Sequence, residues 1–265
     1  MKQAIVTGAY GAIGLAISEG LAKAGMRVTM VGKELSKLEQ AVERLAGSVS
    51  RDHILPVAVD LGDPQAIRDF ADHWTGELDI LINNAATAPR PRITTCEGIE
   101  MQWAVNVLGY YRMITQLAPK MAGSPDARII NVASYWAGGL RLDDPEFLRR
   151  RYDNDSAYRQ SKQADRMLTA AFAERLKPQG ITINACHPGD VNSKISNDLG
   201  FGGHQTPAQG AATPVWLALS AEVQGITGKY FEMRSETPCS FMSNRQEVEA
   251  LYSLCRSYDD QTARP

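Results

Sequence analysis

Short apolar runs alternate with segments of helical periodicity along the 265 residues of this chain. Apolar positions recur at helical spacing in the intervening segments 14–25, 63–74 and 156–176. Strands and helices in alternation predict βαβ units, a mainly parallel sheet and right-handed crossovers. We therefore expect an α/β fold, a doubly wound parallel sheet of about seven strands with helices on both faces. The apolar runs, predicted as strands buried on both faces, span 3–8, 27–32, 54–59, 78–83, 127–134, 181–187 and 228–233.

The composition suits one large domain, residues 1–265. Hydrophobic residues make up 44% and charged residues 22% of the chain, and no Pro-, Gly- or Ser-rich linker divides it. The net charge of −2 is too balanced for a nucleic-acid-binding surface. No apolar run approaches the roughly 20 residues of a membrane span. The N-terminus also lacks the features of a signal peptide, so we expect a cytoplasmic protein.

The cysteines and histidines give no pattern typical of a metal site. The four cysteines lie far apart without a C-x-x-C pair, which argues against both a zinc cluster and a disulfide framework. None of the four histidines is paired with another at a spacing of four residues. We therefore expect no metal cofactor.

A small-residue loop follows the first predicted strand, in the sequence TGAYGAIG of residues 7–14. Ligands of such folds bind at the carboxyl ends of the strands, and small residues there let backbone N–H groups approach a pyrophosphate at a helix N-terminus. A glycine spacing of G-x-x-x-G-x-G would need glycine at position 12, where this chain has Ala12 after Gly11. The loop is either a nucleotide site or a turn that resembles one. Alanine keeps the backbone N–H, so we expect binding to survive if the φ angle of Ala12 is negative.

Several short motifs occur together in one order along the chain. They are TGAYGAIG (7–14), DL (60–61), NNAA (83–86), VN (105–106), NVAS (131–134), YRQSK (158–162) and HPGDVNS (187–193). In order and spacing this set resembles the short-chain dehydrogenase/reductase family over nearly the whole chain. The gap from Ser134 to Tyr158 and the segment 227–238 are most similar to the retinol dehydrogenase-like branch. The resemblance implies a Rossmann-type fold and an oxidoreductase that uses a nicotinamide cofactor.

Tyr158 and Lys162 are four residues apart, so both side chains lie on one face of a helix. A nearby lysine cation favours the phenolate and lowers the pKa of the tyrosine, so the pair can act as general acid or base. Ser134 follows a predicted strand, where its hydroxyl can bind a substrate carbonyl oxygen. The alternative is an ordinary exposed Tyr–Lys pair on an amphipathic helix.

Asn106 is a polar residue on a predicted apolar helical stripe. A polar side chain there is costly unless it is hydrogen-bonded, for example as a buried amide satisfied by a neighbouring helix. The resemblance implies instead that Asn106 holds a water linking Lys162 to solvent, and that Asn106, Ser134, Tyr158 and Lys162 form a catalytic tetrad. The stripe could also supply an oligomer interface, although such stripes are more often core. Its apolar members are Ile99, Trp103, Tyr110, Met113 and Leu117.

The resemblance also implies the cofactor-binding residues. Asp60 and Leu61 would contact adenine, and the turn with Asn84 and Ala85 would lie beneath the adenosine half. The chain departs from the family pattern at Ala86, which replaces glycine, and at Ser193, which replaces threonine. The complete predicted set is Gly8, Tyr10, Gly11, Ala12, Ile13, Gly14, Lys33, Asp60, Leu61, Asn84, Ala85, Tyr158, Lys162, Pro188, Gly189, Val191 and Ser193.

The end of the second predicted strand indicates which cofactor is used. An acidic residue there would bind the ribose 2′-hydroxyl of NAD and repel a 2′-phosphate. This chain has Gly32 and then Lys33, which leave room for a phosphate and supply a cation. We therefore expect NADP(H) to be favoured over NAD(H). Lys33 can also be a solvated lysine at the start of a helix, with Glu34 partly offsetting its charge.

Two segments border the expected active site, residues 138–156 and 190–207. The first includes three consecutive arginines, but its acidic residues balance them, so it fits a solvated loop better than a site for an acidic partner. We expect both segments to cover the substrate, since lids in such enzymes are mobile loops.

We therefore expect an NADP(H)-dependent ketoreductase or alcohol dehydrogenase. It would act on a small apolar ketone, aldehyde or alcohol, such as a retinoid-, steroid- or polyketide-like compound. Two alternatives remain open: a catalytically silent NAD(P)-binding sensor or scaffold, and epimerase or dehydratase chemistry on the same fold. The resemblance also implies a homo-oligomer, a dimer or tetramer.

Overall fold

The computed structural model describes residues 1–262, and in this range eight strands form one sheet in the order β3-β2-β1-β4-β5-β6-β7-β8. Strands β1 to β7 pair in parallel, and only β8 is antiparallel to its neighbour. The strands are β1 (Gln3–Thr7), β2 (Arg27–Gly32), β3 (Ile54–Ala58), β4 (Ile80–Asn83), β5 (Arg128–Val132), β6 (Thr182–His187), β7 (Tyr230–Glu232) and β8 (Ser235–Glu236).

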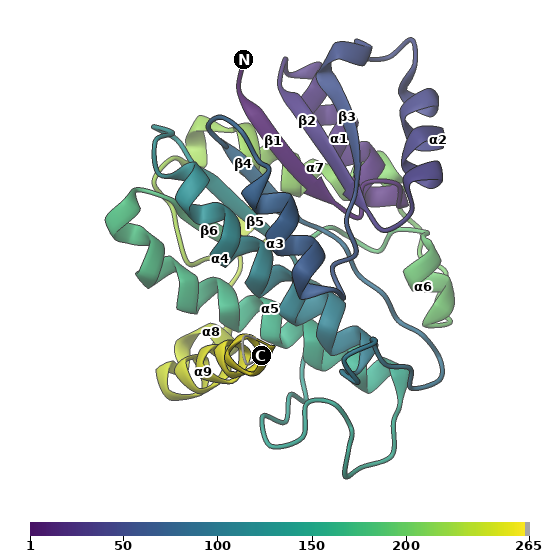
Figure 1. The fold of residues 1–265 in the computed structure, drawn as a ribbon, viewed down its shortest axis with the longest axis vertical. Coiled ribbons are helices and arrows are strands. Elements are labelled where there is room, and N and C mark those ends of the chain that lie inside the picture. Colours follow the sequence, from purple (N-terminus) through teal and green to yellow (C-terminus); the bar gives the residue numbers. More distant parts are fainter. Residues whose placement is uncertain (263–265) are drawn as a thin grey trace.

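Helices cover both faces of the sheet (Figure 1). One face packs against α1 (Ala12–Lys23), α2 (Leu35–Leu45) and α7 (Pro207–Leu219). The other packs against α3 (Pro64–Asp72), α4 (Gly109–Met121) and α5 (Asn154–Leu176), with a π-helical turn, Trp103–Leu108, leading into α4. Three further helices are α6 (Lys194–Asp198), α8 (Ser240–Ser243) and α9 (Arg245–Thr262). Short 3-10 turns lie at Arg51–His53, Lys177–Gln179 and Ala221–Val223.

The central strands are mainly apolar because both of their faces are buried. In β1, Ala4 and Val6 belong to the hydrophobic cluster beneath α1, while Ile5, which points to the opposite face, belongs to the cluster beneath α4 and α5. All three are fully buried. The prediction of a doubly wound, mainly parallel sheet in one domain is therefore confirmed.

All seven predicted runs form strands, but the estimate of about seven strands missed β8. This two-residue strand follows a turn in which Met233 and Arg234 have φ angles of 46° and 62°. Hairpin turns with positive φ usually carry Gly, Asn or Asp, and this one has none of them. The usual sequence signal for a hairpin is therefore missing.

The apolar stripe over residues 99–117 is core. All five of its predicted members are buried, and all but Tyr110 belong to the cluster that α4 and α5 share. Helix α9 lies beside α5 (Figure 1), and the Tyr252 ring of α9 packs 5.5 Å from Tyr111 and 5.4 Å from Phe172. The chain thus covers this stripe itself, and a homo-oligomer would have to form through another surface.

Within the part of the chain that the structure describes, none of the helices is both long and apolar enough to cross a membrane.

Candidate active site

A cavity of about 510 Å³ opens at the carboxyl ends of the parallel strands. Its walls come from the β1–α1 loop, the ends of β2 to β6, helix α5 and the segment that includes α6. Every predicted catalytic and cofactor-binding residue except Asn106 lines this one cavity. The structure therefore brings together residues that lie up to 185 positions apart, from Gly8 to Ser193.

Two glycines of the β1–α1 loop, Gly8 and Gly14, stand where side chains do not fit. Gly8 has a φ of +64°, and a Cβ atom there would lie 2.7 Å from the Ala85 Cα atom. A Cβ on Gly14 would overlap the Gly8 carbonyl oxygen. Ala12 is the first residue of α1 and has a helical, negative φ. This is the backbone conformation that we expected Ala12 to need if the loop is to bind a nucleotide. The loop thus combines close backbone packing with a helix N-terminus, the usual setting for a pyrophosphate.

Gly32, at the end of β2, faces an aromatic ring. A Cβ on Gly32 would lie 2.6 Å from Cε1 of Tyr10, so only glycine lets this ring pack against the strand end. The Lys37 ammonium lies 5.7 Å from the centroid of the same ring. Lys33 also lies here, so two lysines border the cavity at the position where the second strand ends.

Both lysines are held by carboxylates. Lys33 Nζ lies 2.8 Å from Asp60 Oδ2, and Lys37 Nζ lies 2.6 Å from Glu34 Oε1. The hydrogen bond with Asp60 raises the pKa of Lys33, which therefore stays cationic at neutral pH. Sequence reasoning did not identify Lys37. Lys37 lies four residues after Lys33, at the start of a helix, and this spacing could have indicated that both lysines face the same site.

Lys162, on α5, is buried beside Tyr158. Its Nζ donates to the Val132 carbonyl oxygen at 3.0 Å and to Asp165 Oδ2 at 2.8 Å, and lies 5.8 Å from the centroid of the Tyr158 ring. Ser134 follows β5, and its Oγ accepts a hydrogen bond from the Trp136 N–H at 3.1 Å. The predicted Tyr–Lys pair is therefore not an exposed pair on a helix surface, because Lys162 lies within the protein core.

The pKa of Tyr158 lies above its ordinary value of 10.0. Burial is the largest cause of the rise, and Asp165 adds to it. Lys162 and a hydrogen bond with Ser134 lower the pKa, but they do not outweigh burial. The prediction from spacing gave the effect of the lysine correctly and missed the larger effect of desolvation.

Asn106 lies in the π-helical turn and is fully buried. Its Oδ1 accepts from the Thr87 N–H at 2.9 Å, and its Nδ2 donates to the Thr87 carbonyl and to Ser161 Oγ, each at 3.1 Å. The amide therefore ties the segment after β4 to α5, next to Lys162, which agrees with a buried amide satisfied in part by a neighbouring helix. Its role in holding a water stays a prediction. π-helical turns of this kind often occur at functional sites.

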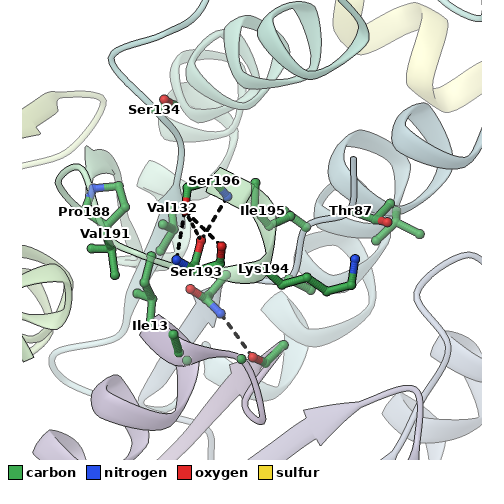
Figure 2. Close-up of a pocket in the computed structure, with 18 of the residues that line it drawn as sticks. Ile13, Thr87, Val132, Ser134, Pro188, Val191, Ser193, Lys194, Ile195 and Ser196 are labelled. Carbon is green, nitrogen blue, oxygen red and sulfur yellow. Dashed lines mark hydrogen bonds between the residues drawn. The ribbon is translucent and has the colours of Figure 1, made fainter. Parts of the chain in front are cut away.

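Ser193 caps helix α6. Its Oγ accepts from the Ser196 N–H at 3.2 Å, and its own N–H donates to Ser196 Oγ at 2.8 Å, as Figure 2 shows. Val191 pairs with Gln205 just before this cap. The segment after β6 is thus held against the cavity where the predicted cofactor residues Pro188 and Gly189 also lie.

The rest of the cavity wall is largely apolar and aromatic. The Tyr135 and His187 rings lie 4.7 Å apart, and the Trp136 and Phe201 rings lie 5.6 Å apart. Burial lowers the pKa of His187 to about 4, so this ring is neutral at neutral pH. This part of the wall consists of Ile93, Met101, Tyr135, Trp136, His187, Ile195 and Phe201. Ile195 and Phe201 belong to the predicted cover segment 190–207, whereas the sequence analysis gave the other five no contact with the substrate.

Within residues 1–262, no three His, Cys, Asp or Glu side chains come together in a group that could hold a metal ion.

Fold and cavity together define a Rossmann-type dinucleotide-binding protein. The short chain dehydrogenase family model matches residues 2–200, and the chain belongs to this family of oxidoreductases, whose fold binds nicotinamide cofactors. It is 36% identical to a "Probable oxidoreductase" of Streptomyces antibioticus over 89% of this chain and 86% of that protein.

Two further similarities concern the branch and the fold. The chain is 32% identical to retinol dehydrogenase 13 of Mus musculus, over 95% of this chain and 82% of that protein. This identity places it in the retinol dehydrogenase-like branch that the sequence motifs indicated. A crystal structure of an uncharacterized protein from Mycobacterium paratuberculosis has a TM-score of 0.82 and 26% identity, covering 97% of this chain and 92% of that one.

Proposed function

We propose that this protein is an NADP(H)-dependent oxidoreductase that transfers hydride to or from the carbonyl or alcohol carbon of an apolar substrate. One observation carries the proposal. A single cavity contains the glycine loop, the lysines at the end of β2, and the side chains of Ser134, Tyr158 and Lys162. A protein that only bound a nucleotide would need the loop, but not the acid–base pair at the other end of the cavity.

The β1–α1 loop fits the diphosphate of a dinucleotide. Gly8 and Gly14 leave the backbone uncovered, and the N–H groups at the start of α1 face the same cavity. When bound, the nicotinamide supplies or accepts the hydride. The protein's own part is to hold the substrate and to move a proton to or from its oxygen.

Tyr158 is the proton donor for carbonyl reduction in this proposal. Its Oη gives a proton to the substrate oxygen, and in alcohol oxidation it takes the proton back. The Ser134 hydroxyl donates a hydrogen bond to the same oxygen as negative charge develops there. The Lys162 ammonium stabilises the phenolate form of Tyr158, because it is a buried cation close to that ring.

The end of β2 supports a preference for NADP(H). Gly32 brings no carboxylate, and Lys33 and Lys37 offer two ammonium groups to a 2′-phosphate. A charge-assisted contact contributes roughly 1.5–3 kcal/mol, which corresponds to about tenfold to a hundredfold in affinity. Asp60 and Glu34 compete for these ammonium groups, so the lysines would exchange one anionic partner for another.

The substrate region supports an apolar substrate. Aromatic and aliphatic side chains dominate it, and His187 is uncharged at neutral pH. A retinoid-, steroid- or polyketide-like carbonyl compound suits such a wall better than an anionic metabolite. We propose that segments 138–156 and 190–207 cover this substrate. Phe201 supports the second segment, because it lines the cavity and its ring lies 5.6 Å from that of Trp136. No residue of 138–156 lines the cavity, although Trp136 just before that segment does.

The test is NADPH consumption against a panel of lipophilic ketones and aldehydes, with Tyr158→Phe as the control. Turnover by the natural protein and its loss in the variant support the proposal. A silent sensor would bind NADPH and reduce no compound of the panel. An epimerase or dehydratase would change its substrate without net NADPH consumption. Either of these results would contradict the proposed function.

A further inference from the structure

Asp165 is a buried carboxylate in direct contact with the catalytic lysine. Tyr158, Lys162, Asp165 and Thr169 follow one another at steps of four, three and four residues, so they lie along one stripe of α5. Asp165 is fully buried, and its Oδ2 lies 2.8 Å from Lys162 Nζ. A carboxylate is seldom placed in a protein interior unless a cation accompanies it, and here that cation belongs to the proposed acid–base pair.

The contact fixes the direction of the ammonium. Lys162 has three N–H donors, of which one is used by the Val132 carbonyl and one by Asp165. Lys162 Nζ also lies 5.0 Å from the centroid of the Tyr110 ring and 5.8 Å from that of the Tyr158 ring, so the third donor is left for these two tyrosines. Asp165 is held in turn at its main chain, where its carbonyl oxygen accepts from Thr169 Oγ1 at 2.8 Å.

The carboxylate is incompletely satisfied. Its Oδ1 has no hydrogen-bond partner within residues 1–262. Burial raises the pKa of Asp165 to about 7, although the Lys162 ammonium acts to lower it. Burial acts to lower the pKa of Lys162, but the charge of Asp165 and the neighbouring phenols raise it more, so the lysine stays cationic.

The tyrosine and cysteine side chains that face this pair from neighbouring elements are uncharged at neutral pH. Burial raises the pKa of Tyr110 on α4, of Cys186 on β6 and of Cys255 on α9 well above their ordinary values. Arg112 on α4 is paired with Asp259 on α9 through a contact of 2.7 Å. The charges that act on Tyr158 from this side are thus those of Lys162 and Asp165.

We propose, on the basis of the proposed function, that Asp165 is a positioning residue that orients the Lys162 ammonium and offsets part of its charge. The negative charge of Asp165 opposes the effect of Lys162 on Tyr158 and keeps the tyrosine in its protonated, proton-donating form to higher pH. The arrangement thereby favours carbonyl reduction over alcohol oxidation at neutral pH.

The first experiment measures the titration of Tyr158 without any substrate. The tyrosinate absorbance of the folded protein is recorded against pH, and the curve of the matching Tyr158→Phe variant is subtracted. In Asp165→Asn, which keeps the shape of the side chain and removes its charge, the Tyr158 midpoint should fall by about one pH unit. Asp165→Ser carries the same expectation if the asparagine variant does not fold. Asp165→Glu, which keeps the charge, should stay closer to the natural protein than either.

The second experiment is the pH profile of kcat for alcohol oxidation. In Asp165→Asn, the pH at which kcat rises should be lower than in the natural protein by the same amount as the Tyr158 midpoint. Thr169→Val is the matched control, because it disturbs the same stripe of α5 without changing a charge, and it should leave both midpoints in place. An unchanged Tyr158 midpoint in Asp165→Asn, or an equal shift in Thr169→Val, would overturn the proposal. If no substrate is turned over, the proposed function fails, while the titration still decides the role of Asp165.

Discussion

Lys33 Nζ lies 2.8 Å from Asp60 Oδ2, so the lysine expected to bind a 2′-phosphate is paired with a carboxylate expected to contact adenine. More than half of the Lys33 side chain is exposed, and pairs of this kind contribute at most about 1 kcal/mol. A phosphate can therefore compete for Lys33 at little cost.

Lys33→Ala should lower kcat/KM for NADPH by roughly tenfold to a hundredfold and leave kcat/KM for NADH nearly unchanged. The reason is that the 2′-phosphate is the group that distinguishes the two cofactors. Kinetics with both cofactors at one substrate concentration measure the effect. Lys23→Ala is the matched control, since Lys23 is a paired lysine of α1 that does not line the cavity. A natural protein that used NADH equally well would contradict the assignment.

Lys37→Ala tests the second lysine. Lys37 reaches the same strand end over the Tyr10 ring, so its loss should also weaken NADPH use and spare NADH. We expect an effect of the same order as for Lys33→Ala, because Lys37 is likewise paired with an exposed carboxylate, Glu34, at 2.6 Å. Equal losses with NADPH and NADH would show that Lys37 acts on the fold of the site and not on the 2′-phosphate.

The glycine loop allows a paired prediction on Ala12 and Gly14. Ala12→Gly should leave NADPH affinity unchanged or improve it, because the alanine already has helical φ and an available N–H. Gly14→Ala should reduce affinity by more than about tenfold, because its Cβ would overlap the Gly8 carbonyl and displace the loop. Calorimetry with NADPH measures both. Tight binding by Gly14→Ala would show that the loop does not hold the cofactor.

The sheet and the cavity residues could be predicted because their signals are local. Strands such as β1 and β4 are mainly apolar, since both faces are buried, and they precede the loops that build the site. The grouping of Tyr158 with Ser134 could be predicted only through the family resemblance. Strand β8 could not be predicted, because Met233 and Arg234 have positive φ angles in the turn before it and neither is a glycine.

The electrostatics of the site depend on contacts that spacing does not reveal. Desolvation of Tyr158 depends on how β5, β6 and α5 pack, and it outweighs the lysine four residues away. The pairing of Lys33 with Asp60 joins residues of two different strand ends. Asn106 is hydrogen-bonded to Thr87, 19 positions away, and no motif around either residue indicates that they are partners.

Helix α9 should stabilise the fold through Tyr252. This ring packs against Tyr111 and Phe172, and the Arg175 guanidinium lies 3.7 Å from its centroid. Tyr252→Ala should lower the free energy of unfolding by about 2–3 kcal/mol, less than for a fully buried aromatic residue because Tyr252 is partly exposed. Urea unfolding measures this change. Ser253→Ala, at an exposed neighbouring position, should change the free energy by less than about 0.5 kcal/mol.

Tyr158→Phe should reduce carbonyl reduction by at least the roughly 10²–10⁴-fold that a general acid contributes, while NADPH binding stays nearly intact. The variant removes the acidic hydroxyl and keeps the ring that packs near Lys162. Because the pKa of Tyr158 lies above 10.0, reduction by the natural protein should persist through neutral and mildly alkaline pH. Alcohol oxidation needs the phenolate, so its rate should rise with pH over the same range. Steady-state kinetics in both directions, with calorimetry for NADPH, measure these effects. A variant that turned over at even half the natural rate would show that another group supplies the proton.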